Sequence, residues 1–380
     1  MPGFHNASTR TFTGIRLTLA VALAAVICTA GSRIVGAHEL ELTEVHVTFD
    51  NDGTYRIEVM NDPDWLLMRV EPFSGLELSG RLEPQQRNRR LVEMEPTFAE
   101  WVHLYFDGKR AEVEATYLPP TTEGPMAPDD TLLGTMRIDG RVPEGAATFS
   151  FAFGLIMDPY PLLIREGDDE VITYWNVGEF ETDVFDLGAL TPPTRWEVVR
   201  TYLHLGYTHI LPKGLDHILF VIGIFLLSTR IKPMLVQVTT FTVAHTMTLG
   251  LTIYGVLSLP STVVEPLIAL SIAYVAIENL VTSELKPWRI ALVFTFGLLH
   301  GMGFAGVLSE LGLPRSEAVP ALMSFNLGVE GGQVTVIAAM FLALGWGRHK
   351  SWYRRVAVVP LSLAIAAVGL YWTVTRIAGG

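Results

Sequence analysis

Thiol groups are nearly absent from this 380-residue chain, which contains a single cysteine. That residue, Cys28, ends the apolar run Leu17–Cys28, which follows Arg10 and Arg16. A basic segment, an apolar run and small residues up to Ala37 are typical of a secretory signal, so residues 1–37 are predicted to be cleaved off. The mature chain would then have no thiol, which excludes disulfides and thiolate metal ligands. An uncleaved anchor is the alternative.

Charge is also scarce and unevenly distributed. Acidic and basic residues make up 17% of the chain and hydrophobic residues 49%, which is too apolar for an ordinary soluble enzyme. Residues 38–200 contain 32 acidic and 13 basic residues, whereas residues 201–380 contain 7 and 11. These numbers predict an acidic soluble region followed by a membrane region. The soluble region has no basic patch and the chain has no P-loop, which argues against nucleic-acid binding and an ATP motor.

Residues 38–193 are expected to form an extracytoplasmic antiparallel β-sandwich. Short runs there alternate apolar and polar residues and are separated by Gly, Pro and Asp, as in sandwich strands. Cleavage would leave His38 at the N-terminus, where its amine and ring could chelate a metal, with His46 on the same strand face. This N-terminal metal site is speculative, because most exposed strand histidines bind nothing. The clearest runs are Leu40–Phe49, Val102–Phe106, Gly134–Val142 and Thr148–Leu155.

The last half of the chain is predicted to be a bundle of six transmembrane helices. Residues 194–213 are expected to provide an interfacial amphipathic helix, Arg195–Ile210, and a linker. Residues 214–380 form the membrane domain, and its first hydrophobic segment is short for a hydrocarbon core of about 30 Å. The six segments lie near 214–229, 234–256, 262–282, 289–309, 318–344 and 356–377.

The orientation follows from the basic residues between these segments. If the β domain lies outside, the outer loops and tail contain only Arg315 and Arg376. This asymmetry agrees with the positive-inside rule. The sequence therefore predicts a multi-pass protein of a bacterial inner membrane, with the bilayer as a partner and the N-terminal domain periplasmic. The inner loops contain Arg230, Lys232, Lys286, Arg289, Arg348, Lys350, Arg354 and Arg355.

A cluster of potential metal ligands opens the first segment. His209, Asp216 and His217 lie within nine residues, just before an apolar run. Imidazole suits nickel, cobalt, zinc and copper, and a carboxylate suits harder ions. The residues can converge on one continuous helix, or through a break at Pro212-Lys213-Gly214. The same stretch is compatible with a helix N-terminal carboxylate and two histidines hydrogen-bonded at the interface.

Polar residues also occur inside the later segments. His245, His300 and Glu330 fall at similar central depths, which favours a common interior metal site. Each of these residues could instead have a packing role, in which its side chain pairs with that of a neighbouring residue. An ionised carboxylate at mid-membrane costs about 2.5–3.5 kcal/mol, so such groups need cations, protons or partners. Possible accessory residues are Glu265, Glu278, Asn279, Asn326 and Gln333.

The membrane half resembles the HupE/UreJ family. The similarity covers roughly residues 200–344 and rests on four ordered motifs. It implies a membrane protein linked to nickel, and also cobalt, entry, and it matches His209, Asp216, His217 and His300 to family motifs. The large β domain and Lys213 within the first motif depart from the family pattern. The motifs are His209-Ile-Leu-Pro-Lys-Gly-Leu-Asp-His217, Phe241-Thr-Val-Ala-His245-Thr-Met-Thr-Leu249, Phe296-Gly-Leu-Leu-His300-Gly-Met-Gly-Phe-Ala305 and Phe325-Asn-Leu-Gly-Val-Glu330.

The leading hypothesis is a divalent metal permease or metal-handling protein. Nickel is the first candidate for the metal, followed by cobalt, copper or zinc. Its predicted metal residues are His209, Asp216, His217, His245, His300 and Glu330. An intramembrane metal-dependent hydrolase, with Glu330 or Glu278 as base, is one alternative. A membrane-anchored receptor or assembly protein is another. The sequence does not indicate an oligomeric state.

Overall fold

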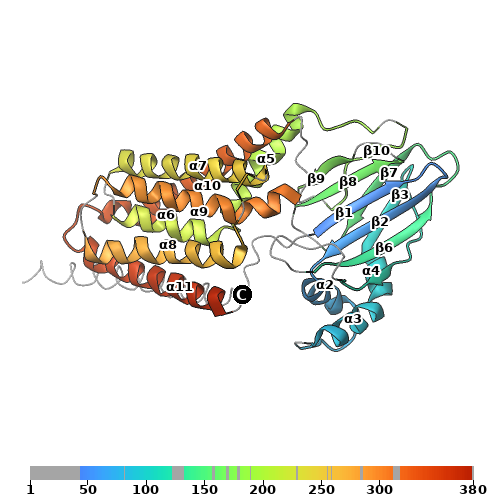
Figure 1. The fold of residues 1–380 in the computed structure, drawn as a ribbon, viewed down its shortest axis with the longest axis horizontal. Coiled ribbons are helices and arrows are strands. Elements are labelled where there is room, and N and C mark those ends of the chain that lie inside the picture. The colour runs from blue at the N-terminus through green and yellow to red at the C-terminus, as the bar shows by residue number, and fades with distance from the viewer. Residues whose placement is uncertain are drawn as a thin grey trace, which may run out of the picture. The chain divides into compact units, whose positions relative to one another are not determined.

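The computed structural model describes residues 43–80, 82–121, 132–155, 159–167, 171–177, 180–188, 190–227, 230–254, 256–257, 259–282, 286–310 and 317–378 (Figure 1). The predicted signal segment 1–37 and His38 lie outside these residues. The chain divides into two compact units. A β-rich unit contains residues 40–201 and 307–321, and a helical unit contains residues 202–306 and 322–380.

The β-rich unit contains two sheets. The six-stranded sheet has the order β5-β6-β2-β1-β8-β9, and the four-stranded sheet has the order β10-β7-β3-β4. Strands β1 and β2 form a hairpin in which Val47 pairs with Ile57, and Gly53 provides the positive φ that the turn requires. The strands are β1 (Thr43–Phe49), β2 (Thr54–Asn61), β3 (Val102–Phe106), β4 (Lys109–Arg110), β5 (Thr116–Leu118), β6 (Gly134–Arg141), β7 (Thr148–Phe153), β8 (Tyr160–Glu166), β9 (Ile172–Asn176) and β10 (Phe185–Asp186).

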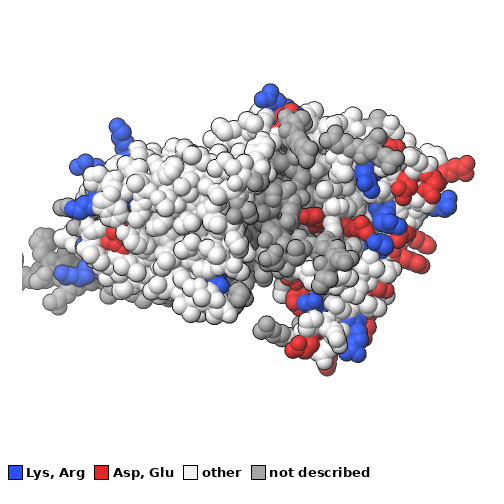
Figure 2. Space-filling model, in the orientation of Figure 1, with Lys and Arg blue, Asp and Glu red and all other residues white. Residues whose placement is uncertain are grey.

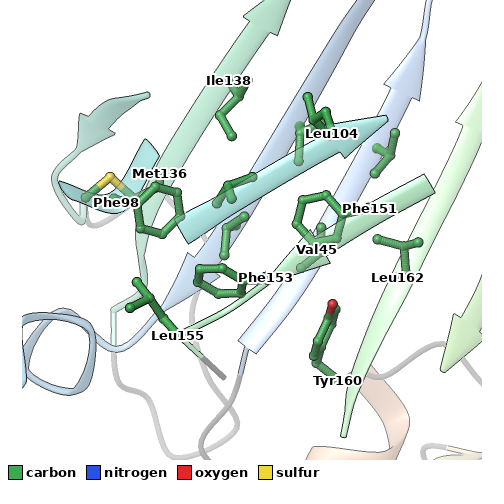
Figure 3. Close-up of a cluster of buried hydrophobic side chains, with 14 of the residues drawn as sticks. Val45, Phe98, Leu104, Met136, Ile138, Phe151, Phe153, Leu155, Tyr160 and Leu162 are labelled. Carbon is green, nitrogen blue, oxygen red and sulfur yellow. The ribbon is translucent and has the colours of Figure 1, made fainter. Parts of the chain in front are cut away.

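One hydrophobic core is shared by the two sheets (Figure 3). Val45 and Leu162 of the six-stranded sheet and Leu104 and Phe151 of the four-stranded sheet all belong to it. Across the layers, the ring of Phe151 meets that of Tyr160 edge-on, with centroids 6.5 Å apart. The alternation of apolar and polar residues in the sequence therefore produces two faces that are buried against each other.

Two features of this unit depart from the predicted antiparallel domain. Strands β1 and β8 pair in parallel, which is possible because they are far apart in the sequence and not joined by a hairpin. Residues 63–101 also contain helices. Asp62 caps the first of these helices by accepting hydrogen bonds from the backbone amides of Asp64 and Trp65, and Pro63 is its first residue. The helical elements are α2 (Pro63–Val70), η1 (Glu71–Phe73), α3 (Pro84–Glu93) and α4 (Glu95–Trp101).

The helical unit contains a helix at each of the six predicted hydrophobic segments, and these helices lie side by side in Figure 1. Helix α5 has the predicted bounds and begins within the β-rich unit. Short η2 (Gly345–Gly347) and η3 (Arg354–Val358) connect the last two helices. The helices are α5 (Arg195–Ile210), α6 (Leu215–Leu227), α7 (Ile231–Ile253), α8 (Ser261–Val281), α9 (Arg289–Glu310), α10 (Ala318–Leu344) and α11 (Val359–Ala378).

Four helices of the described residues are long and apolar enough to cross a membrane, or five if a bent pair counts as one span. The four are α7, α8, α10 with η2, and η3 with α11. The bent pair is α5 and α6, which meet at 69°, and Arg289–Gly303 of α9 is a shorter apolar stretch. Helix α6 has 13 residues, so it rises about 20 Å and cannot cross a core of about 30 Å alone. The chain is therefore a multi-pass membrane protein, and the six-span count stays a prediction.

Glycines bring the helices around α7 and α10 into backbone contact. A Cβ on Gly206 of α5 would strike the backbone carbonyl of Phe325 on α10. A Cβ on Gly301 of α9 would strike the carbonyl of His245 on α7. Small residues permit this close approach between membrane helices. These contacts set α5 against α10 and α9 against α7 at the level of the predicted ligands.

The two units differ in surface charge, as the sequence predicts. In Figure 2 the acidic side chains cover much of the visible surface of the β-rich unit, whereas the visible face of the helical unit is almost uncharged. The Lys and Arg atoms visible on the helical unit gather mostly at one end (Figure 2). An uncharged lateral surface suits contact with lipid, because charged side chains are costly there.

Candidate metal centre

The break between α5 and α6 brings the first two histidines together. Helix α5 ends at Ile210 and α6 begins at Leu215, and the chain turns by 69° between them. His209 in the last turn of α5 therefore lies beside His217 in the first turn of α6, with ring centroids 4.8 Å apart. Of the two routes to convergence, the structure uses the break and not a continuous helix.

Two further helices each add a histidine. His245 of α7 has its ring centroid 5.9 Å from that of His217 and 6.2 Å from that of His209. His300 of α9 lies 5.0 Å from His217 by the same measure. All four side chains are buried, with 6% exposure or less. Ligand nitrogens of His209, His217 and His245 lie within 4.8 Å of one another, so these three could hold a metal ion.

Hydrogen bonds fix the Nδ1 atoms of three of the rings. The Nδ1 of His217 lies 3.1 Å from Asp216 Oδ1, and that of His300 lies 2.8 Å from the carbonyl oxygen of Phe296. The Nδ1 of His245 lies 3.0 Å from Asn326 Oδ1. Asn326 Nδ2 donates to the carbonyl of Leu322, which confirms that Oδ1 faces the imidazole. Because each partner accepts, each Nδ1 must carry the proton.

The opposite nitrogens of these rings are consequently bare. The Nε2 atoms of His217, His245 and His300 are buried and have no hydrogen-bond partner among the described residues. Leaving a buried polar atom without a partner costs about 1–3 kcal/mol for each of these three nitrogens. An imidazole that donates through one nitrogen and presents the lone pair of the other is the usual arrangement of a metal ligand. The residues therefore fit a metal ion.

Asp216 lies next to His217, and its role as a ligand stays a prediction. Its Oδ1 accepts from the backbone amide and from Nδ1 of His217, at 2.8 and 3.1 Å. It lies in the first turn of α6, as the helix-terminal alternative expected. The carboxylate thus orients His217 and contributes negative charge next to the cluster, and it is not in the group of three whose ligand atoms converge.

Glu330 of α10 has a threonine of α7 as its hydrogen-bond partner. Its carboxylate accepts from Thr239 of α7 at 2.7 Å, and it is not in the converging group. Gln333 accepts from Thr242 of α7 at 3.0 Å. Asn326 of the same helix does contact a cluster histidine, His245, through a hydrogen bond. Similar depth in the membrane therefore does not specify which way a side chain faces.

Glu278 has a cation as its partner. Arg289 Nη1 lies 2.7 Å from Glu278 Oε2, and Arg289 Nε donates to Gln237 at 3.0 Å. Asn279, the next residue, donates to the carbonyl of Gly223 on α6 at 2.9 Å. Glu265 lies 3.7 Å from Arg376. The compensation that Glu278 was expected to need from a passing cation is therefore supplied by a side chain.

Arg289 is a buried residue whose structural role sequence reasoning missed. It was assigned to an inner loop, yet its side chain is only 1% exposed. Its place at the first turn of a long apolar segment, with glutamate at the end of the preceding one, was the available signal. In the β-rich unit, His46 lies 3.1 Å from Glu44. The partner predicted for His46, His38, lies outside the described residues.

Comparisons with known proteins bear on the helical half. The sequence model of the family described as "HupE / UreJ protein" matches residues 188–376. No curated protein and no solved structure matches the chain. The match covers α5 through almost all of α11 and so includes all four histidines of the cluster. Through residues 188–376, the chain belongs to the HupE / UreJ family.

Proposed function

We propose that this protein is a membrane permease for a divalent transition-metal ion of the nickel and cobalt type. The observation that carries the proposal is the convergence of three buried imidazoles, from α5, α6 and α7, with ligand atoms within 4.8 Å of one another. Family membership supports the same conclusion, because the HupE/UreJ resemblance implies a role in nickel or cobalt entry. The metal ion is the cargo, and the cluster is its binding site within the membrane.

The donor set favours borderline metals. The cluster offers imidazole nitrogens, which suit nickel, cobalt, zinc and copper, whereas magnesium and calcium require mostly oxygen ligands. Metal–nitrogen bonds of about 2.0–2.1 Å place tetrahedral ligands about 3.3 Å apart. The nitrogens of His209, His217 and His245, within 4.8 Å of one another, would move inward by roughly 1 Å on binding. Asp216 would offset part of the added charge through His217.

The topology belongs to the same proposal. Helices α5 and α6 together would form the first of six spans, with the cluster at the bend between them. The end of the bundle with most Lys and Arg would face the cytoplasm by the positive-inside rule. The acidic β-rich unit would then lie in the periplasm, where its charge raises the local concentration of cations.

Metal content and uptake test the proposal. The purified full-length chain is exposed to a mixture of nickel, cobalt, zinc and copper and then examined by elemental analysis, and uptake is measured in proteoliposomes. We expect wild type to retain one metal and to transport it, and His217→Ala to lose both. His204→Ala is the matched control, because His204 is an exposed histidine of the same helix as His209. Equal binding and uptake by well-folded His217→Ala and His204→Ala proteins would overturn the proposal.

No observation in the described residues favours the hydrolase alternative. It requires a general base beside the metal, and the two glutamates considered for that role contact Thr239 and Arg289 instead. A membrane-anchored receptor or assembly protein would not require the histidines to converge. The hydrolase and the receptor alternatives would both gain support if metal bound to the protein but failed to cross the membrane.

A further inference from the structure

An aromatic layer lies one helical turn from the histidines on three helices. Each of His217, His245 and His300 has a phenylalanine three or four residues away, towards the same end of the bundle because α6 runs opposite to α7 and α9. These are Phe220, Phe241 and Phe296. The centroids of Phe220 and Phe241 are 5.1 Å apart, and those of Phe220 and Phe296 are 6.0 Å apart. The three rings therefore form one layer.

Phe241 is the centre of this layer. Its centroid lies 4.9 Å from that of His300, 5.7 Å from His217 and 6.2 Å from His245. Its ring is nearly parallel to His245, at 22°, and nearly perpendicular to His217, at 86°. With no exposure to solvent, Phe241 closes one side of the cluster with hydrocarbon. On another side, Phe325 lies 5.6 Å from His209.

The polar groups near the histidines are engaged elsewhere. The hydroxyl of Thr248 bonds to the carbonyl of Ala244 in its own helix, and that of Thr242 bonds to Val238 and Gln333. Asn326 Oδ1 accepts from His245. Apart from the carboxylate of Asp216, which bonds to His217, a metal ion at the cluster would thus find mainly imidazoles as ligands among the described residues. Water, the usual extra ligand, would have to displace the Phe241 ring on that side.

We infer that Phe241, backed by Phe220, is a specificity-determining residue that limits the bound metal to a four-coordinate site. His209, His217 and His245 supply three nitrogens that lie within 4.8 Å of one another, His300 beside His217 closes in as the fourth, and the aromatic layer blocks a fifth and sixth ligand. Ions that require six ligands, such as magnesium, bind weakly at this site because they keep several bound waters. Ions that accept four nitrogen ligands are selected. This inference rests on the proposed metal site.

Cobalt(II) reports coordination number directly. A tetrahedral field has no inversion centre, so the visible d–d bands of four-coordinate cobalt are intense, whereas those of six-coordinate cobalt are weak. Detergent-purified full-length protein is loaded with Co²⁺ alone, and its visible spectrum is recorded for wild type and for Phe241→Ala. We expect intense bands for wild type and their loss in Phe241→Ala, with cobalt still bound, as water enters the space left by the ring.

The control is Phe225→Ala, because Phe225 is equally buried in the same unit but packs against Phe341 and Arg348. It should keep the wild-type spectrum. If Phe241→Ala does not fold, Phe241→Leu is measured with Phe225→Leu. Weak bands in wild type, or unchanged intense bands in a folded Phe241 variant, would overturn the inference while leaving the metal site intact. Absence of cobalt binding in wild type would instead overturn the proposed site, and this inference with it.

Discussion

The two units differ in how far their buried polar side chains are satisfied by hydrogen bonds. In the β-rich unit, buried Glu71 accepts from the backbone amide and hydroxyl of Ser79 and from Arg90, all within 2.8 Å. In the helical unit, three buried imidazoles keep a bare Nε2, and the ring centroid of His217 lies 5.9 Å from that of His245 and 5.0 Å from that of His300. Other buried atoms without partners, such as Asn61 Oδ1 and Trp65 Nε1, do not belong to such a cluster. Satisfied groups stabilise a fold, whereas a concentration of unsatisfied ones indicates a ligand.

The helical unit also contains its own counterexample. Glu278 and Arg289 are both buried and pair with each other, and Arg289 also donates to Gln237, although Glu278 Oε1 and Arg289 Nη2 have no hydrogen-bond partner among the described residues. A buried charge in a membrane helix is therefore not by itself a functional site, and the state of its hydrogen bonds must decide. The following predictions test this distinction, starting with the largest expected effect.

Breaking the Glu278–Arg289 pair should cost the most stability. Glu278→Ala leaves a buried guanidinium without its carboxylate, which costs about 3–5 kcal/mol. Thermal unfolding in detergent measures this loss. Glu265→Ala is the matched control, because Glu265 is 39% exposed and its pair with Arg376 should contribute about 1 kcal/mol or less. Replacing both Glu278 and Arg289 by leucine should recover much of the loss, and a double variant as unstable as Glu278→Ala would contradict a structural role.

Separating α5 from α10 should damage the metal site through packing alone. Gly206→Ala places a methyl group against the backbone carbonyl of Phe325, and overpacking of this kind costs about 1–3 kcal/mol. His209 lies one turn further along α5 and would move with it. We expect weaker metal binding by isothermal titration, whereas Gly331→Ala, with 3.8 Å to Tyr207, should bind as wild type does. Equal binding by both variants would argue against His209 as a ligand.

Removing the acceptor behind His245 should weaken metal binding without removing a ligand. Asn326→Leu frees Nδ1 of His245, and loss of such a supporting hydrogen bond typically costs tenfold to a hundredfold in metal affinity. Competition with a chelator measures the change. Gln333→Leu is the control on the same helix, because Gln333 bonds to Thr242 and not to a histidine. Similar losses in both variants would show that α10 acts through packing.

The smallest effect concerns pH and the β-rich unit. Burial alone would raise the pKa of Glu71, but hydrogen bonds from Ser79 and the charge of Arg90 hold that pKa below its ordinary value of 4.5. A depressed carboxyl pKa contributes stability above the unfolded value, and this contribution is lost as the pH falls below about 4.5. Glu71→Gln should lose about 1 kcal/mol at neutral pH. Its difference from wild type should shrink in acid, as followed by urea unfolding, and a constant difference would contradict the linkage.

Much of the helical unit was predictable because hydrophobic length and polar content are local properties of a sequence. The six apolar segments, the bounds of α5 and the four histidines were all identified from the chain alone. The β strands were visible through their alternation, but the parallel β1–β8 pair and the helices within residues 63–101 were not. A strand's partner after a long connection depends on the whole sheet and leaves no local pattern.

The sequence by itself determined which residue types lie in apolar surroundings: the histidines, the glutamates and the amides of the spans. Only the tertiary structure decided their partners. It paired Arg289 with Glu278, Thr239 with Glu330 and Asn326 with His245, and it left the Nε2 atoms of three buried histidines without a hydrogen-bond partner among the described residues. The physical reason is that a helix fixes depth and periodicity, whereas hydrogen bonding between helices depends on rotation and on the close packing that glycines allow.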